Sequence, residues 1–172
     1  MIDHTFKIII FGDVSSGKSM FIQRFLKDLF ESDQTMTIGV DLYTKTLTVD
    51  DRIVKLQIFN FGAEERFSFL LSTYARGSLG GLFLYDVTDY STITHIDDWL
   101  SLIRKELRPE DKFPILLVGI VTDEGSVRQV SAEDGKKITK SRNLDGYIEC
   151  NLKTGKNVEK AFEALVRIIL KI

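Results

Sequence analysis

Residues 12–19 constrain this chain more than any other segment, because they carry the complete phosphate-loop pattern G-x-x-x-x-G-K-[ST]. An apolar run from Phe6 to Phe11 precedes the pattern, and apolar residues at helical spacing follow it. This order places the backbone N–H groups of the loop at a helix N-terminus, where the helix dipole favours anions. Lys18 would then contact the outer phosphates of a nucleotide, and Ser19 would bind Mg²⁺. The alternative, a glycine turn with a chance lysine, is disfavoured by the flanking strand and helix.

Composition predicts a single domain over residues 1–172. The chain is 44% hydrophobic and 28% charged, which suffices for one buried core but not for two. Its formal net charge of −2 and pI of about 5.7 provide no excess of basic residues for binding nucleic acid. The one cysteine, Cys150, excludes an internal disulfide, and we expect it to be a small buried residue at the end of a strand.

No targeting or membrane-spanning segment is evident in the sequence. No apolar stretch approaches the length of a membrane span, and the N-terminus has neither a signal-peptide pattern nor a glycine at position 2. We therefore expect a cytoplasmic protein that has no intrinsic membrane anchor in this chain and reaches membranes only through partners.

Apolar patterning predicts alternating strands and helices. The phosphate-loop helix should extend to about Leu29, and Asp50 and Asp51 should form the turn of a hairpin. Strands are predicted over residues 6–11, 42–49, 53–60, 80–87, 114–121 and 146–150. Helices are predicted over residues 93–107 and 158–169, and a capping box formed by Ser131 and Asp134 predicts the start of another short helix. This pattern indicates an α/β fold, with a six-stranded, mostly parallel sheet, one antiparallel strand and helices on both faces. Ligands of such sheets bind beyond the carboxyl ends of the strands.

Five short segments occur in the order seen in small GTPases of the Ras superfamily. They are the phosphate loop, Thr-Ile-Gly-Val-Asp at 37–41, Glu-Arg-Phe at 65–67, Tyr-Asp-Val-Thr at 85–88, and Trp99 with Leu100. The chain resembles Rab-like members most strongly. The resemblance implies a P-loop GTPase fold that binds GTP or GDP with Mg²⁺, acts as a conformational switch, and hydrolyses GTP. Effector and regulator proteins would bind through residues 31–41 and 61–76.

The same resemblance assigns roles to individual residues. Thr37 would close on Mg²⁺ and the γ-phosphate, and Phe30 would pack against guanine, although a strand-entering threonine and a core aromatic are the simpler interpretations of each alone. The metal would be held by Ser19, Thr37 and, through a water, Asn60. Lys18 would be catalytic, as would Glu64 at the water-positioning site. The predicted nucleotide site comprises Asp13, Val14, Ser15, Ser16, Gly17, Lys18, Ser19, Met20, Phe30, Thr37, Ala63, Asp123, Leu152 and Lys153.

The second switch departs from the family pattern Asp-x-x-Gly-Gln. Asn60 replaces a carboxylate, so a charge-assisted contact worth about 1.5–3 kcal/mol becomes a neutral one nearer 1 kcal/mol. Ala63 replaces a glycine whose N–H meets the γ-phosphate, and Glu64 replaces the glutamine that orients the attacking water. Val14 adds a branched side chain near the γ-phosphate. These changes predict weak metal binding and slow hydrolysis, and they leave open whether an activating protein is needed.

The base-binding motif departs as well. Where the family has Asn-Lys-x-Asp, residues 120–123 are Ile-Val-Thr-Asp, so only the carboxylate of Asp123 remains. This carboxylate accepts hydrogen bonds from guanine, whereas adenine would oppose it with a lone pair, so a preference for guanine should persist at lower affinity. Further along, Leu152 would offer a backbone N–H to the base, and Lys153 matches the family lysine.

Two hypotheses from different classes follow. The first is a Rab-like GTP/GDP switch with slow hydrolysis, and the residues that favour it are Lys18, Ser19, Thr37 and Asp123. The alternative is a degenerate pseudo-GTPase that acts as a protein-interaction module, favoured by the altered second switch and base motif. An ATP-using kinase would need a lid and further arginines around the transferred phosphate, for which the sequence shows no sign.

Overall fold

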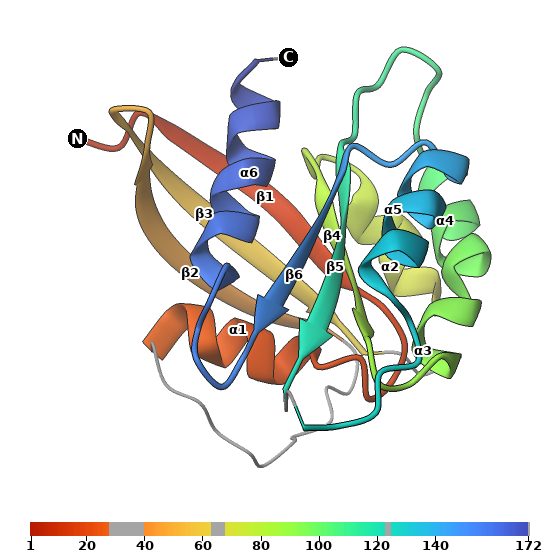
Figure 1. Cartoon of the computed structure of the whole chain (residues 1–172). Coiled ribbons are helices and arrows are strands. Elements are labelled where there is room, and N and C mark those ends of the chain that lie inside the picture. The colour runs from red at the N-terminus through yellow and green to blue at the C-terminus, as the bar shows by residue number, and fades with distance from the viewer. Residues whose placement is uncertain (28–39, 63–67, 123–124, 172) are drawn as a thin grey trace.

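The strand β1 (His4–Phe11) lies inside a six-stranded sheet (Figure 1). Its side chains enter a hydrophobic core on each face of this sheet. Ile8 and Ile10 pack into one core, whereas Ile9 and Phe11 pack into the other, because successive side chains of a strand point to opposite faces. Burial on both faces explains the continuous apolar run before the phosphate loop. The structure, a computed structural model, describes residues 1–27, 40–62, 68–122 and 125–171.

The sheet has the strand order β2-β3-β1-β4-β5-β6, in which β2 runs antiparallel to β3 and the other neighbours are parallel. This arrangement confirms the predicted fold class. The remaining strands are β2 (Val40–Val49), β3 (Arg52–Phe61), β4 (Gly81–Asp86), β5 (Ile115–Val121) and β6 (Gly146–Asn151). The helices in the described ranges are α1 (Lys18–Lys27), α2 (Ser68–Ala75), α3 (Ser91–Thr94), α4 (Ile96–Arg104), α5 (Ala132–Ser141) and α6 (Val158–Leu170).

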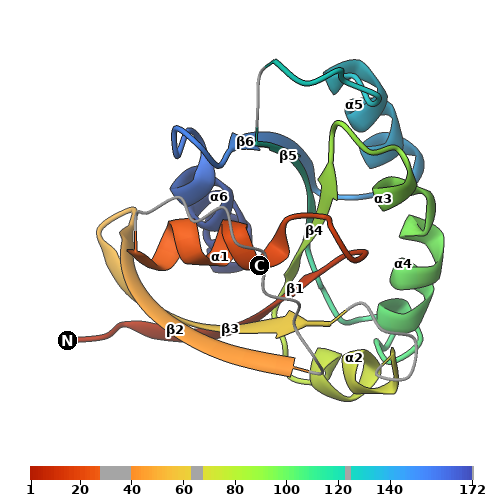
Figure 2. The ribbon, with the colours of Figure 1, turned by 90° about the horizontal axis from the view of Figure 1, so that it is seen from below.

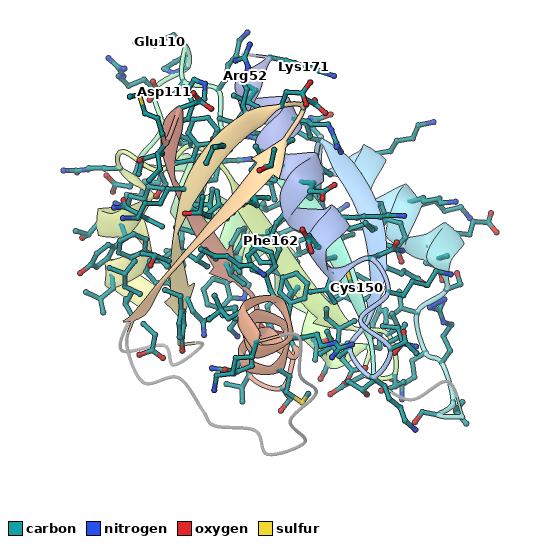
Figure 3. All side chains as sticks on the ribbon, turned by 90° about the vertical axis from the view of Figure 1, so that its left-hand side faces the viewer. Arg52, Glu110, Asp111, Cys150, Phe162 and Lys171 are labelled. Carbon is teal, nitrogen blue, oxygen red and sulfur yellow. The ribbon has the colours of Figure 1, made fainter. Side chains whose placement is uncertain are left out.

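Helices cover both faces of the sheet. Viewed from below, α1 and α6 lie on one face, and α2, α3, α4 and α5 lie on the other (Figure 2). On the first face, Phe162 of α6 stacks on Phe21 and Phe25 of α1, with ring centroids 5.1 and 3.7 Å apart (Figure 3). On the second face, Phe11 packs against Phe83 and Trp99 at centroid distances of 5.3 and 6.2 Å. These aromatic contacts hold α1 against α6 on the first face and α4 against β1 on the second.

Two local predictions are confirmed by backbone geometry. Asp50 and Asp51 connect β2 and β3 with φ angles of 49° and 64°, the left-handed pair that a tight hairpin turn requires. Ser131 caps α5, because its Oγ accepts a hydrogen bond of 3.0 Å from the backbone N–H of Asp134. Cys150 is buried near the end of β6, as expected, and burial raises the pKa of its thiol to about 12.

The helix predicted over residues 93–107 is wrong as a single element. The structure contains α3 and α4 instead, separated at His95, whose φ of −92° and ψ of 13° interrupt the helical geometry. Asp89 helps to begin α3 earlier than predicted, since its carboxylate accepts hydrogen bonds from the N–H and hydroxyl of Ser91. Apolar spacing alone did not reveal this break, because Ile93 and Ile96 remain buried on both sides of it.

The helix α2 was not predicted. Its sequence, Ser-Phe-Leu-Leu-Ser-Thr-Tyr-Ala, has adjacent apolar residues in place of a clear helical stripe. Leu71 and Ala75 are buried against the sheet, whereas Leu70 and Tyr74 are partly exposed.

Over the described parts of the chain, no helix has the length and apolar character needed to cross a membrane.

Candidate functional site

The phosphate loop leaves the carboxyl end of β1 and enters α1 with a backbone that requires glycine at both ends. Gly12 has a φ of 147°, and a Cβ there would lie 2.4 Å from the carbonyl oxygen of Leu84. Gly17 has a φ of 93°, and a Cβ there would lie 3.1 Å from Cγ2 of Ile120. The two glycines let the loop approach Leu84 of β4 and Ile120 of β5 closely, so its amide groups are held at the start of α1.

Lys18 is held inside this loop, although lysine is rarely buried. Its side chain is only 7% exposed, and its Nζ donates to the carbonyl oxygens of Gly12 at 2.7 Å and Asp13 at 2.9 Å. Burial lowers the pKa of Lys18 to about 8, and the nearby Asp13 charge opposes that shift. An anion bound by the loop would offset the cost of burying this cation, so the geometry suits phosphate.

The carboxylate of Asp13 points to the helices α3 and α4. Its Oδ1 accepts a hydrogen bond of 2.7 Å from Nε1 of Trp99, and its Oδ2 lies 2.5 Å from Nδ1 of His95. The hydrogen bond and charge of Asp13 raise the pKa of His95. Sequence reasoning placed Asp13 in the nucleotide site but did not identify His95 or the indole N–H of Trp99 as its partners.

The residues predicted for the metal fit a hard cation by their chemistry. Ser19 lies in the first turn of α1, and Asn60 lies near the end of β3, opposite Ile10 of β1. Both offer neutral oxygen atoms, which Mg²⁺ accepts when phosphate and water complete its coordination. Asn60 is fully buried. Its amide is uncharged, whereas the family pattern has a negatively charged carboxylate at this position.

The other residues of the predicted loop differ in exposure. Val14 is 48% exposed, and Ser15 is exposed with a φ of 65°, so both border the open side of the loop. Ser16 is fully buried, and Met20 packs its side chain into the core beneath α1. Any nucleotide contact by Met20 must therefore come from its backbone. Five further predicted site residues lie outside the described residues: Phe30, Thr37, Ala63, Glu64 and Asp123.

In residues 151–154, which would contact the base, several polar groups already form hydrogen bonds within the protein. The N–H of Leu152, predicted to meet the base, donates to the carbonyl oxygen of Val121 at 2.9 Å. The Oδ1 of Asn151 accepts from the N–H groups of Lys153 and Thr154, each at 3.0 Å. Lys153 itself is exposed. A contact between Leu152 and a base would thus require this N–H to exchange or share its acceptor.

Ile120 takes a structural role at the position where the family pattern has asparagine. Its side chain is fully buried in the core and lies against the backbone of Gly17. The apolar contact keeps β5 and the phosphate loop together, whereas an asparagine would do so by hydrogen bonds. The substitution therefore preserves packing at this point while it removes polar groups near the base.

A chain of hydrogen bonds leads from the buried Tyr85 through Tyr147 and Glu149 to the exposed Arg128, and the sequence did not predict it. The hydroxyl groups of Tyr85 and Tyr147 lie 2.8 Å apart, and Tyr147 donates to Glu149, which also pairs with Arg128 at 2.6 Å. Burial raises the pKa of Tyr85 to about 12. The available signal was Gly119, a glycine within an apolar strand, where a Cβ would lie 2.9 Å from the Tyr85 hydroxyl.

Comparisons with known proteins agree with this geometry. A family model described as Ras family matches residues 7–171. The chain is 38% identical to Ras-related protein RABA6b of Arabidopsis thaliana over 95% of this chain and 70% of that protein. It is 35% identical to Ras-related protein RGP1 of Oryza sativa subsp. japonica over 99% and 74% of the two chains, and 38% identical to Ras-related protein Rab-1 of Theileria parva over 97% and 75%. The chain therefore belongs to the Ras family of small GTPases and is similar to its Rab members, with a divergent second switch and base-binding motif.

Proposed function

We propose that this protein is a GTP/GDP switch that binds its nucleotide with Mg²⁺ and hydrolyses GTP slowly. The observation that carries the proposal is the buried ammonium of Lys18, held by the carbonyl oxygens of Gly12 and Asp13 within a complete phosphate loop. A cation buried in this way gains from an anionic ligand, and the N–H groups at the start of α1 supply the remaining contacts.

Phosphate binding is assigned to the loop and to Lys18. The backbone N–H groups from Asp13 to Ser19 would surround the β-phosphate, and Lys18 would contact the β- and γ-phosphates. Ser19, Thr37 and Asn60 would hold Mg²⁺, the last through a water. The metal would neutralise charge on the phosphate oxygens.

Slow hydrolysis is proposed from the residues near the γ-phosphate. Glu64 lacks the amide N–H groups that orient a water, and its negative charge would oppose the triphosphate. Val14 lies on the open side of the loop, where its branched side chain would occupy the space that a catalytic arginine or glutamine needs. Asn60 would place the metal less firmly than a carboxylate does.

Partner binding is proposed for residues 31–41 and 61–76. Within the described part of these segments, β2 is an edge strand, and α2 packs on the sheet beside α4. Effector and regulator proteins would contact these elements when the nucleotide changes, and an activating protein would supply the missing catalytic groups. We propose a cytoplasmic protein that reaches membranes through such partners.

The first experiment identifies the nucleotide that co-purifies with the protein by mass spectrometry, followed by calorimetry of GDP with Mg²⁺. Lys18→Ala should abolish phosphate binding, because the loop N–H groups alone leave the phosphate charges undercompensated. Lys160→Ala is the matched control, since Lys160 is exposed on α6. Unchanged GDP affinity in Lys18→Ala would contradict the proposal. If the parent protein binds no nucleotide, the result favours an interaction module that does not switch.

A further inference from the structure

The side chain of Asp13 joins the phosphate loop to the helices on the second face of the sheet. Its two carboxylate oxygens have different partners, Nε1 of Trp99 at 2.7 Å and Nδ1 of His95 at 2.5 Å. We call this group of three residues the Asp13 bridge. Through these hydrogen bonds, Trp99 of α4 and His95, which directly precedes α4, contact the phosphate loop.

The two donors of the Asp13 bridge differ in how firmly they are held. Trp99 is 8% exposed, and its ring packs against Phe11 at the end of β1, so its N–H is fixed by the core. The side chain of His95 is 60% exposed and lies at the break between α3 and α4. The bridge therefore combines one rigid neutral donor with one exposed donor that changes charge near neutral pH.

The charged groups around His95 favour its protonated form. The hydrogen bond and charge of Asp13 are the largest causes of its raised pKa, burial slightly opposes them, and Asp98 on α4 adds a further negative charge. Asp13 in turn faces Lys18, whose Nζ contacts the carbonyl of Asp13. The net charge beside the phosphate loop thus depends on the protonation of one histidine.

We propose that Trp99 and His95 are positioning residues for the phosphate loop, acting through Asp13, and that protonation of His95 strengthens nucleotide binding. The inference rests on the proposed function, because it concerns the same phosphate site. Trp99 fixes the direction of the Asp13 carboxylate and hence the backbone of residue 13. His95 in its cationic form neutralises that carboxylate, which otherwise repels the phosphates of the nucleotide.

Linkage makes the effect reciprocal. If protonated His95 raises the affinity for GDP, then bound GDP must raise the proton affinity of His95 by the same factor. A purely structural contact between α4 and the loop would hold the protein together without coupling these two equilibria. The coupling is therefore the feature that separates the proposal from simple packing.

The first test follows the imidazole signals by NMR during a pH titration with and without GDP and Mg²⁺. The chain has only two histidines, so His4→Gln assigns the signal of His95. The titration midpoint of His95 should rise when GDP binds, and in nucleotide-free protein it should fall in Asp13→Asn. A midpoint that does not move when GDP binds would overturn the proposal, whatever the result in Asp13→Asn, because the contact would then exist without the coupling.

The second test measures GDP dissociation constants across the range in which histidine titrates, about pH 5 to 8. His95→Gln should weaken binding roughly two- to fivefold at the acid end and leave the alkaline end unchanged, as expected for an exposed ion pair. His95→Lys should retain tight binding and show the same residual pH dependence as His95→Gln, which comes from GDP and Lys18. The matched control His4→Gln, on β1, should behave as the parent protein does.

The neutral donor is tested by Trp99→Phe, which keeps an aromatic ring in the core and removes the N–H. GDP binding should weaken roughly tenfold at every pH, because a hydrogen bond to a charged group is lost. Equal GDP affinity in His95→Gln, Trp99→Phe and the parent at all pH values would overturn the proposal while leaving nucleotide binding intact. Failure of the parent protein to bind any nucleotide would instead overturn the proposed function, and the Asp13→Asn titration would still show whether the bridge exists.

Discussion

Ile120 lies directly against the backbone of Gly17, so that a Cβ added to this glycine would meet Cγ2 of Ile120 at 3.1 Å. The contact joins β5, which leads to the base-binding motif, with the loop that would hold the phosphates. Its two members come from sequence motifs more than a hundred residues apart, and the parallel pairing of β1, β4 and β5 brings them together. Packing at this point thus connects the two halves of the candidate site.

Gly17→Ala should destabilise the protein by about 1–3 kcal/mol, because a non-glycine residue at a φ of 93° is strained and its methyl group crowds Ile120. Urea unfolding measures this loss. Gly77→Ala is a matched control, since Gly77 has a φ of 75° but no atom within 4 Å of the added Cβ. The cost should be larger at Gly17. Equal losses in the two variants would show that the contact with Ile120 contributes nothing.

Guanine should be preferred over adenine, with lower affinity than in relatives that retain Asn-Lys-x-Asp. The preference is assigned to Asp123, and the weak affinity follows because Ile120 is buried in the core and the N–H of Leu152 already has an acceptor. Competition between GDP and ADP provides the measurement, repeated with Asp123→Ala. Equal binding of the two nucleotides by the parent protein would count against this assignment.

Single-turnover GTP hydrolysis should be slow, and Glu64→Gln alone should accelerate it little. Val14 crowds the space in which a glutamine amide would orient water, so the two positions should act together. The double variant Val14→Gly with Glu64→Gln should exceed the product of the two single effects. A large acceleration by Glu64→Gln alone, measured in the same assay, would refute this account.

Nucleotide affinity should fall as the pH rises above about 8, the pKa of Lys18 in the free protein. Bound phosphates favour the charged ammonium and so raise its pKa, which means that binding must take up protons in this range. Calorimetry in buffers of different ionisation enthalpy measures this uptake after correction for the titration of free GDP. Binding without proton uptake near pH 8 would show that Lys18 does not meet the phosphates.

Tyr147→Phe should destabilise the fold by about 1–3 kcal/mol, because it removes the hydroxyl that connects Tyr85 with Glu149 and leaves the hydroxyl of the buried Tyr85 without this partner. Tyr90→Phe is the control, since Tyr90 is 57% exposed and its hydrogen bonds in the described chain are made by its backbone N–H and carbonyl groups. Thermal unfolding of the two variants distinguishes them. Similar melting temperatures would show that the hydrogen bonds of Tyr147 do not stabilise the fold.

The raised pKa of Tyr85 predicts that the free energy of unfolding falls at alkaline pH. The pKa of Tyr85 rises from 10.0 to about 12 on folding, so the folded state holds its proton at a pH where the unfolded state loses it. This contribution to stability is complete below pH 10 and is lost as the pH rises towards 12. The free energy of unfolding of Tyr85→Phe, which removes this titrating group, should therefore depend less steeply on pH in this window than that of the parent protein.

The fold was largely predictable because its signals are local. The phosphate-loop pattern, the two-sided apolar run of β1 and the Asp50–Asp51 turn each specify a structure within a few residues. The break at His95 was not predictable in this way, because the apolar spacing continues across it. α2 was missed since its apolar residues are adjacent and form no stripe.

The site was predictable only where one motif contains all the partners. Lys18 contacts residues of its own loop, so its position there follows from the pattern, and its contact with phosphate stays a prediction. The partners of Asp13 lie more than eighty residues further along the chain, and Tyr147 of β6 contacts Tyr85 of β4, which lies 62 residues earlier. Such contacts depend on the sheet order, which a single sequence motif does not encode.

The register between β1 and β3 has a consequence for engineering this protein. Ile10 pairs with Asn60 at the site end of the sheet, whereas His4 pairs with Val54 near the Asp50–Asp51 turn. An insertion within β3 would move Asn60 along the strand by about 3.3 Å and turn it to the other face of the sheet. An insertion at the turn would leave every pair intact. The turn is therefore the place to attach a fluorescent or affinity label, because it lies at the far end of β3 from the nucleotide site.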